Sequence, residues 1–136
     1  MGARLRHIAI GCEDPKGIGQ FYAEMLDLEL LVHSENLSVL TDGTMNIVLV
    51  RGELFEPAAV RQPGLVGFHH IGFHVESRAE VEARLVARGA TKVEEDEVPA
   101  DKEDAPGASF EAKWLSPDGL IFDLSEQGWP TTKEAL

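Results

Sequence analysis

Residues 69–89, HHIGFHVESRAEVEARLVARG, read as a strand followed by a helix, and they repeat an earlier stretch of the chain. Residues 6–26, RHIAIGCEDPKGIGQFYAEML, align with them so that His7 falls on His70 and Ile8 falls on Ile71. Because an internal repeat dictates the architecture of a chain, this alignment predicts a protein built of two equivalent modules.

Capping signals place one helix in each module. Asp14 is a good N-cap residue with Pro15 at the first helical position, and Ser77 with Glu80 forms a capping-box pattern. Gly89 is suited to the end of the second helix. The first helix carries residues at the spacing of a buried stripe: Ile18, Phe21, Tyr22, Met25 and Leu26.

Three strand-like runs follow each helix, and a tight turn, TDGT (41–44) or SPDG (116–119), precedes the last run of each module. The runs cover 28–34, 37–41, 45–50, 91–98, 109–115 and 120–126. The sequence therefore predicts an α+β fold, a single domain of two βαβββ modules. We expect module one at about 4–51, a linker at 52–66, module two at about 67–126 and a tail at 127–136.

Composition excludes several kinds of partner. The net charge of -12 repels nucleic acid and anionic membranes, so we expect neither as a partner. No apolar run approaches the roughly 18 residues that cross a bilayer. The lone cysteine, Cys12, cannot form an internal disulfide, which fits a reducing cytoplasm.

The alternation of side chains along a strand assigns residues to the two faces of the expected sheet. His7 and His70 lie on the face that does not pack on the helices, and each is followed on that face by a very small residue. Asp123, in the last strand, shares this face, and a buried carboxylate is costly unless it is paired, hydrogen-bonded or bound to a metal. We therefore expect His7, His70 and Asp123 to meet in a cavity.

Two further histidines lie on the same strand as His70. His74 shares the face of His70 and is a candidate catalytic acid or base, because imidazole titrates near neutral pH, with ordinary hydrogen bonding as the alternative. His69 falls on the opposite face near the start of the strand, so we expect it at the rim.

The segments RHIAI, FYAEMLDLEL, HHIGFHV and SPDGLIFDLSE resemble the vicinal oxygen chelate superfamily, which includes glyoxalase I, bleomycin-resistance proteins and extradiol dioxygenases. The resemblance runs from about Arg4 to Glu126. It implies a glyoxalase-like fold, in which the two modules curl a mixed sheet around a cavity that holds a divalent metal ion. It also implies a homodimer.

The resemblance further implies metal ligands in the first and last strands of each module. The matching positions are His7, His70 and Asp123, where the family usually has Glu in place of this Asp. The fourth position falls on or near Val48, which cannot bind metal, and Asn46 on the same face is a weak substitute. Two imidazoles and one carboxylate suit iron, manganese, nickel, cobalt or zinc, and they leave open positions for substrate oxygens.

Three functions follow as hypotheses. The first is a metal-dependent lyase, isomerase or dioxygenase acting on a small oxygenated substrate, with His74, Lys113 or Glu111 moving protons. The second is a metal-free protein that binds or sequesters a small molecule, as bleomycin-resistance proteins do, with Trp114 or Phe110 as stacking surfaces. The third is an accessory subunit with a degenerate cavity.

Overall fold

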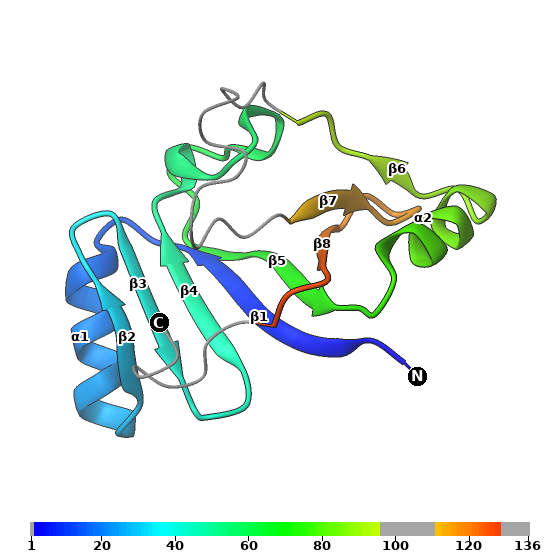
Figure 1. Ribbon diagram of the computed structural model, residues 1–136. Helices are drawn as coiled ribbons and strands as arrows, with labels where there is room; N and C mark the ends of the chain where they lie inside the picture. The colour runs from blue at the N-terminus through cyan, green and yellow to red at the C-terminus, as the bar shows by residue number, and fades with distance from the viewer. Residues whose placement is uncertain (1, 96–110, 129–136) are drawn as a thin grey trace, which may run out of the picture.

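The computed structural model describes residues 2–95 and 111–128, which form one mixed eight-stranded sheet and two α-helices (Figure 1). The strand order is β2-β3-β4-β1-β5-β8-β7-β6, and the sheet is not closed into a barrel. The strands are β1 (Arg4–Gly11), β2 (Glu29–His33), β3 (Leu37–Thr41), β4 (Asn46–Val50), β5 (Gly67–His74), β6 (Thr91–Lys92), β7 (Ala112–Leu115) and β8 (Ile121–Ser125). The helices are α1 (Pro15–Leu26) and α2 (Arg78–Ala87), so the predicted β-α-β-β-β order occurs twice.

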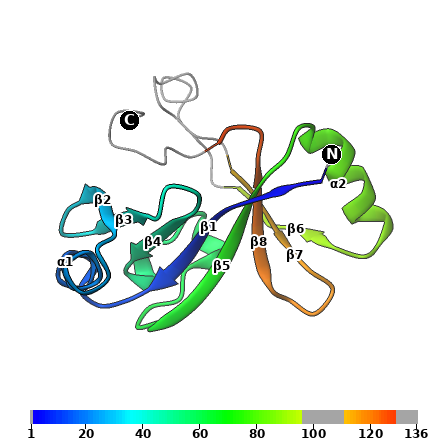
Figure 2. The same ribbon diagram turned by 90° about the horizontal axis from the view of Figure 1, so that it is seen from below.

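The two modules repeat the same strand pairing. In each module the first strand pairs in parallel with the last, β1 with β4 and β5 with β8. The two first strands lie side by side and antiparallel in the middle of the sheet. Helix α1 packs on one half of the sheet and α2 on the other, as Figure 2 shows. The α+β fold expected from the repeat is confirmed, as is the glyoxalase-like arrangement that the resemblance implies.

Both predicted helix starts are confirmed. The Asp14 carboxylate accepts a hydrogen bond from the Gly17 N–H at 3.0 Å, and the Ser77 hydroxyl accepts one from the Glu80 N–H at 3.3 Å. No helix in the described ranges is long and apolar enough to cross a membrane.

The buried face of α1 differs from the predicted stripe. Only Tyr22 of that stripe packs on the core beneath the helix, and the other four residues are 36% to 62% exposed. Those four are Ile18, Phe21, Met25 and Leu26. The residues that approach the sheet are Pro15 and Gly19, both buried. The Ser38 hydroxyl of β3 donates to the Pro15 carbonyl at 2.8 Å, and a Cβ at position 19 would overlap Ser38, so the close approach needs glycine.

The pairing of β1 with β5 contains two β-bulges, one in each strand. Leu5 pairs with Phe73 and His7 with Gly72, which leaves Arg6 as an extra residue in β1. Beyond them, Ala9 pairs with His70 and Ile10 with Phe68, which leaves His69 as an extra residue in β5. A bulge interrupts strict alternation and re-aims the side chain of the extra residue.

The bulge overturns the expectation that His69 lies at the rim. Its side chain is buried, with 4% of the residue exposed, and it lies beside His70. Arg6, at the equivalent position of the first module, is buried as well. Both modules therefore place the residue before the candidate ligand histidine in the interior.

Gly19→Ala is expected to lower the free energy of unfolding by about 1–3 kcal/mol, because the new methyl group overlaps Ser38. The loss is expected although alanine favours a helix over glycine by about 1 kcal/mol. Urea unfolding followed by circular dichroism measures it. Gly128→Ala is the control, since its Cβ would meet nothing closer than 3.8 Å. A Gly19→Ala protein more stable than the wild type would contradict the close packing.

Candidate metal centre

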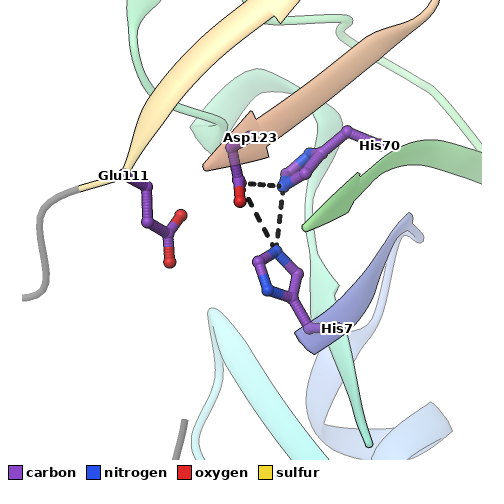
Figure 3. A group of neighbouring side chains, drawn as sticks. All are labelled: His7, His70, Glu111 and Asp123. Carbon is purple, nitrogen blue, oxygen red and sulfur yellow. Dashed lines mark hydrogen bonds and ion pairs between the residues drawn. The ribbon is translucent and has the colours of Figure 1, made fainter. Parts of the chain in front are cut away.

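The three predicted ligands meet where β1, β5 and β8 lie side by side (Figure 3). His7 Nε2 lies 3.2 Å from His70 Nε2 and 3.5 Å from Asp123 Oδ2. His70 Nε2 lies 3.0 Å from the same Asp123 oxygen. All three residues are buried. All three come from a single chain.

Gly72 allows these side chains to converge. It pairs with His7 on one neighbouring strand and with Asp123 on the other. A Cβ at this position would overlap the His7 ring and lie 2.7 Å from Asp123 Oδ1. The small residue therefore leaves room for the cluster itself, rather than opening space for a ligand.

Glu111, directly before β7, adds a fourth donor to the cluster. One ligand atom from each of His7, His70, Glu111 and Asp123 lies within 4.8 Å of the others. Sequence reasoning named Glu111 only as a residue that could move protons. The available signal was its spacing, because Glu111 lies two residues before Lys113, and Lys113 pairs with Asp123 in the adjacent strand.

Two buried cations accompany the carboxylates. Arg6 Nη1 donates to Glu111 Oε1 at 2.6 Å. Lys113 Nζ lies 3.4 Å from Asp123 Oδ2 and 3.5 Å from Glu111 Oε2. Sequence reasoning missed Arg6, because the bulge that turns it inward has no signature in the apolar pattern. The cluster therefore contains two carboxylates and two compensating positive charges.

The environment sets the protonation of these groups. Burial opposes the charge on Asp123, but the close imidazole rings of His7 and His70 and the charge of Lys113 outweigh it and hold the pKa of Asp123 well below its usual range. Burial lowers the pKa of His70, and it lowers the pKa of His69 to about 4. An ionised carboxylate and neutral imidazoles are the forms that bind a metal ion.

The geometry of the cluster fits a divalent metal ion. Ligands about 2.1 Å from a common ion are separated by about 3.0–3.4 Å, for octahedral and tetrahedral arrangements respectively. The three atom pairs formed by His7, His70 and Asp123 span 3.0–3.5 Å. Asp123 Oδ1 is also buried and accepts no hydrogen bond among the described residues. A bound divalent ion would explain this spacing and would provide a partner for the Asp123 carboxylate.

A cavity of about 460 Å³ opens beside the cluster, within the range of small-molecule sites. Its polar wall includes His7, His70, Glu111 and Lys113. Val48, at the fourth family position, lies in its apolar wall. The other apolar residues of the wall are Ala9, Leu37, Val50, Leu54 and Phe55.

The remaining predicted site residues lie elsewhere. His74 Nε2 lies 3.0 Å from the Glu126 carbonyl oxygen, outside the cluster. Asn46 is buried and lines a separate cavity of about 210 Å³. Trp114 belongs to the core under α2, and its Nε1 donates to Glu82 Oε2 at 3.0 Å. Its neighbour Lys113 faces the cluster, so alternation turns Trp114 to the opposite face. Phe110 lies outside the described residues.

Comparison with known proteins identifies the family. A family model described as "Glyoxalase-like domain" matches residues 7–124, which include all four donors of the cluster. The chain belongs to this family, and with it to the vicinal oxygen chelate superfamily. No curated protein matches the sequence.

Several solved structures share the fold. A hypothetical protein from Bacillus halodurans C-125 superposes with a TM-score of 0.71 at 22% identity, covering 97% of this chain and 99% of that chain. A methylmalonyl-CoA epimerase in complex with methylmalonyl-CoA gives 0.64 at 19% identity, covering 90% and 92%. A Mn(II)-bound glyoxalase from Novosphingobium aromaticivorans gives 0.63 at 23% identity, covering 93% of this chain and 41% of that one.

The stability of the metal-free protein is expected to fall as the pH is lowered from about 6.5 to about 4. The unfolded chain protonates His69 near its ordinary pKa of about 6.5, whereas the folded state resists protonation down to a pKa of about 4. The unfolded state then binds more protons, so stability rises with pH across this window, by at most about 3 kcal/mol from this residue.

Urea unfolding in the presence of a chelator, at several pH values across the window, measures this dependence. His69→Phe should flatten the curve, because the ring no longer titrates. His33→Phe is the control, since His33 is exposed, does not belong to the cluster and contacts the Lys16 carbonyl. An equally steep curve for His69→Phe and the wild type would show that His69 is not the group responsible.

Proposed function

We propose that the protein is a divalent-metal enzyme, of the lyase or isomerase type, acting on a small substrate with neighbouring oxygen atoms. The observation that carries the proposal is the convergence of His7, His70 and Asp123 on one buried point beside a cavity. Asp123 Oδ1, which accepts no hydrogen bond there from the described residues, is the additional atom available to an ion.

Each residue of the cluster has a distinct role in this proposal. His7, His70 and Asp123 hold the ion, which supplies polarisation of substrate oxygen atoms when bound. Glu111 is a fourth ligand or the group that accepts a proton from the substrate. The apolar wall around Val48 and Phe55 excludes water from the substrate.

The groups available for proton transfer favour a lyase or isomerase over a dioxygenase. The carboxylate of Glu111 and the ammonium group of Lys113 lie 3.5 Å apart and both line the cavity, so one can accept a proton and the other can return it. We assign these steps to them in preference to His74, which lies outside the cluster. Tyr22, the only tyrosine of the chain, packs under α1, so the cluster has no tyrosine of the kind common in extradiol dioxygenases.

The ion pairs of Lys113 favour a second candidate function. Its ammonium group lies within 3.5 Å of both Asp123 and Glu111, so the buried carboxylates are compensated without a metal. A protein in this state would bind a small molecule in the same cavity without catalysing a reaction. The homodimer stays a prediction.

Metal content separates the two candidates. The wild type is expected to bind about one equivalent of Mn²⁺, Fe²⁺, Co²⁺, Ni²⁺ or Zn²⁺, measured by mass spectrometry after loading and desalting. His70→Ala and Asp123→Ala should lose it, because each removes one of the three or four donors that the described residues bring to the site. His33→Ala is the matched control and should retain the metal.

Wild-type protein that holds none of the five metals after loading would contradict the enzyme proposal. Saturable binding of a small molecule by that protein would then support the second candidate. Equal metal retention by His70→Ala and His33→Ala would place the ion elsewhere.

Lys113→Met is expected to strengthen divalent-metal binding by at least about tenfold. A positive charge near the cluster repels an incoming cation, and in a partly buried site two charges at a few ångströms interact by several kcal/mol before screening. Methionine keeps the length of the side chain without its charge. Competition with a chelating dye measures the dissociation constant. Lys92→Met is the control, because Lys92 pairs with Glu82 of α2, away from the cluster. Weaker binding by Lys113→Met would show that Lys113 supports the ion rather than competing with it.

A further inference from the structure

The side chain of His69 makes several specific contacts, and the proposed function gives this residue no role. Its Nε2 lies 2.6 Å from the Val60 carbonyl oxygen, and its Nδ1 lies 2.7 Å from Nδ1 of His70. Its ring stacks on Phe55, with centroids 3.6 Å apart and planes inclined by 2°. Phe55 and Val60 both belong to the linker between the two modules, so this segment holds the His69 ring from two sides.

These contacts determine where the hydrogen atoms of the two rings lie. A carbonyl oxygen only accepts hydrogen bonds, so His69 Nε2 carries a hydrogen and donates it to Val60. A charged ring is costly in this buried, stacked position, so His69 is neutral and its Nδ1 presents a lone pair. The 2.7 Å contact between the two Nδ1 atoms must then receive its hydrogen from His70.

In a neutral His70 ring, a hydrogen on Nδ1 leaves Nε2 bare. His70 Nε2 therefore presents a lone pair toward Asp123 Oδ2, 3.0 Å away. Two acceptors at this distance repel each other unless a cation lies between them. In the alternative tautomer, a hydrogen on Nε2 would bond to Asp123 and occupy the direction that a metal ion needs.

We propose that His69 is a positioning residue that fixes His70 in the tautomer with its hydrogen on Nδ1, and so prepares Nε2 to bind the metal. The effect on metal affinity rests on the proposed function, whereas the tautomer is a property of the metal-free protein. The equivalent residue of the first module, Arg6, contacts Glu111 instead of the neighbouring His7. The contact that fixes the histidine tautomer therefore belongs to module two alone. A ligand histidine whose second nitrogen is fixed by a hydrogen bond is typically 10–100-fold better at binding metal than one without that partner.

The test begins with the tautomer itself. Long-range ¹H–¹⁵N spectra of protein labelled with ¹⁵N-histidine, recorded near neutral pH with a chelator present, distinguish a protonated from a bare ring nitrogen. In the wild type, His70 should show a protonated Nδ1 and a bare Nε2. In His69→Phe, which keeps a ring against Phe55 but has no acceptor, a signal from protonated Nε2 should appear.

Metal affinity provides the second readout, with Zn²⁺ and Mn²⁺ as the probes in competition with a chelating dye. His69→Phe should weaken both by about 10–100-fold. His69→Gln, whose amide keeps one donor and one acceptor, should restore most of the affinity. His33→Phe removes a histidine that also contacts a backbone carbonyl, and it should bind metal as the wild type does.

A protonated Nε2 on His70 in the wild-type spectrum would overturn the proposal, whether or not the variants fold. An unchanged tautomer in His69→Phe would overturn it as well, even if the affinity fell. A wild type that shows the expected tautomer but holds none of the five metals named above would support the tautomer assigned to His70 and contradict the proposed metal enzyme. The two failures are therefore distinguishable.

Discussion

The antiparallel pairing of β1 with β5 is the constraint on which the rest of the site depends. It brings the first strands of the two modules together, and the parallel pairing of β5 with β8 adds Asp123 from the other side. The backbone of Gly72 lies between His7 and Asp123, and its missing side chain lets them approach one another. A shift of one residue in this register would turn the ligand side chains to the opposite face of the sheet.

The charges of the cluster are nearly balanced before any ligand is added. Arg6 and Lys113 compensate Glu111 and Asp123, while burial disfavours a positive charge on His69 and His70. A buried carboxylate stripped of such partners would destabilise the fold by several kcal/mol. The same ion pairs therefore stabilise the metal-free chain and compete with a metal ion. The interactions of Lys113 thus distinguish the two candidate functions.

Family membership accounts for the scaffold but leaves the chemistry to particular side chains. The glyoxalase-like match covers both modules, and the three solved structures compared above are less than 25% identical to this chain. Asp123 supplies one carboxylate from β8, and Glu111 approaches from the residue before β7 as the second carboxylate. The linker takes part as well, because Phe55 and Val60 hold the ring of His69.

The sequence by itself determined the repeat, the strand and helix order, both helix starts, and the meeting of His7, His70 and Asp123 in one cluster. These follow from local signals, namely capping residues, turn residues and the alternation of side chains along unbroken strands. Only the tertiary structure decided the positions of Arg6, His69 and Glu111, and the buried face of α1. Bulges arise from the pairing of strands distant in sequence, and the face a helix buries depends on contacts such as that of Gly19 with Ser38. No local pattern encodes either, because both are properties of two segments in contact.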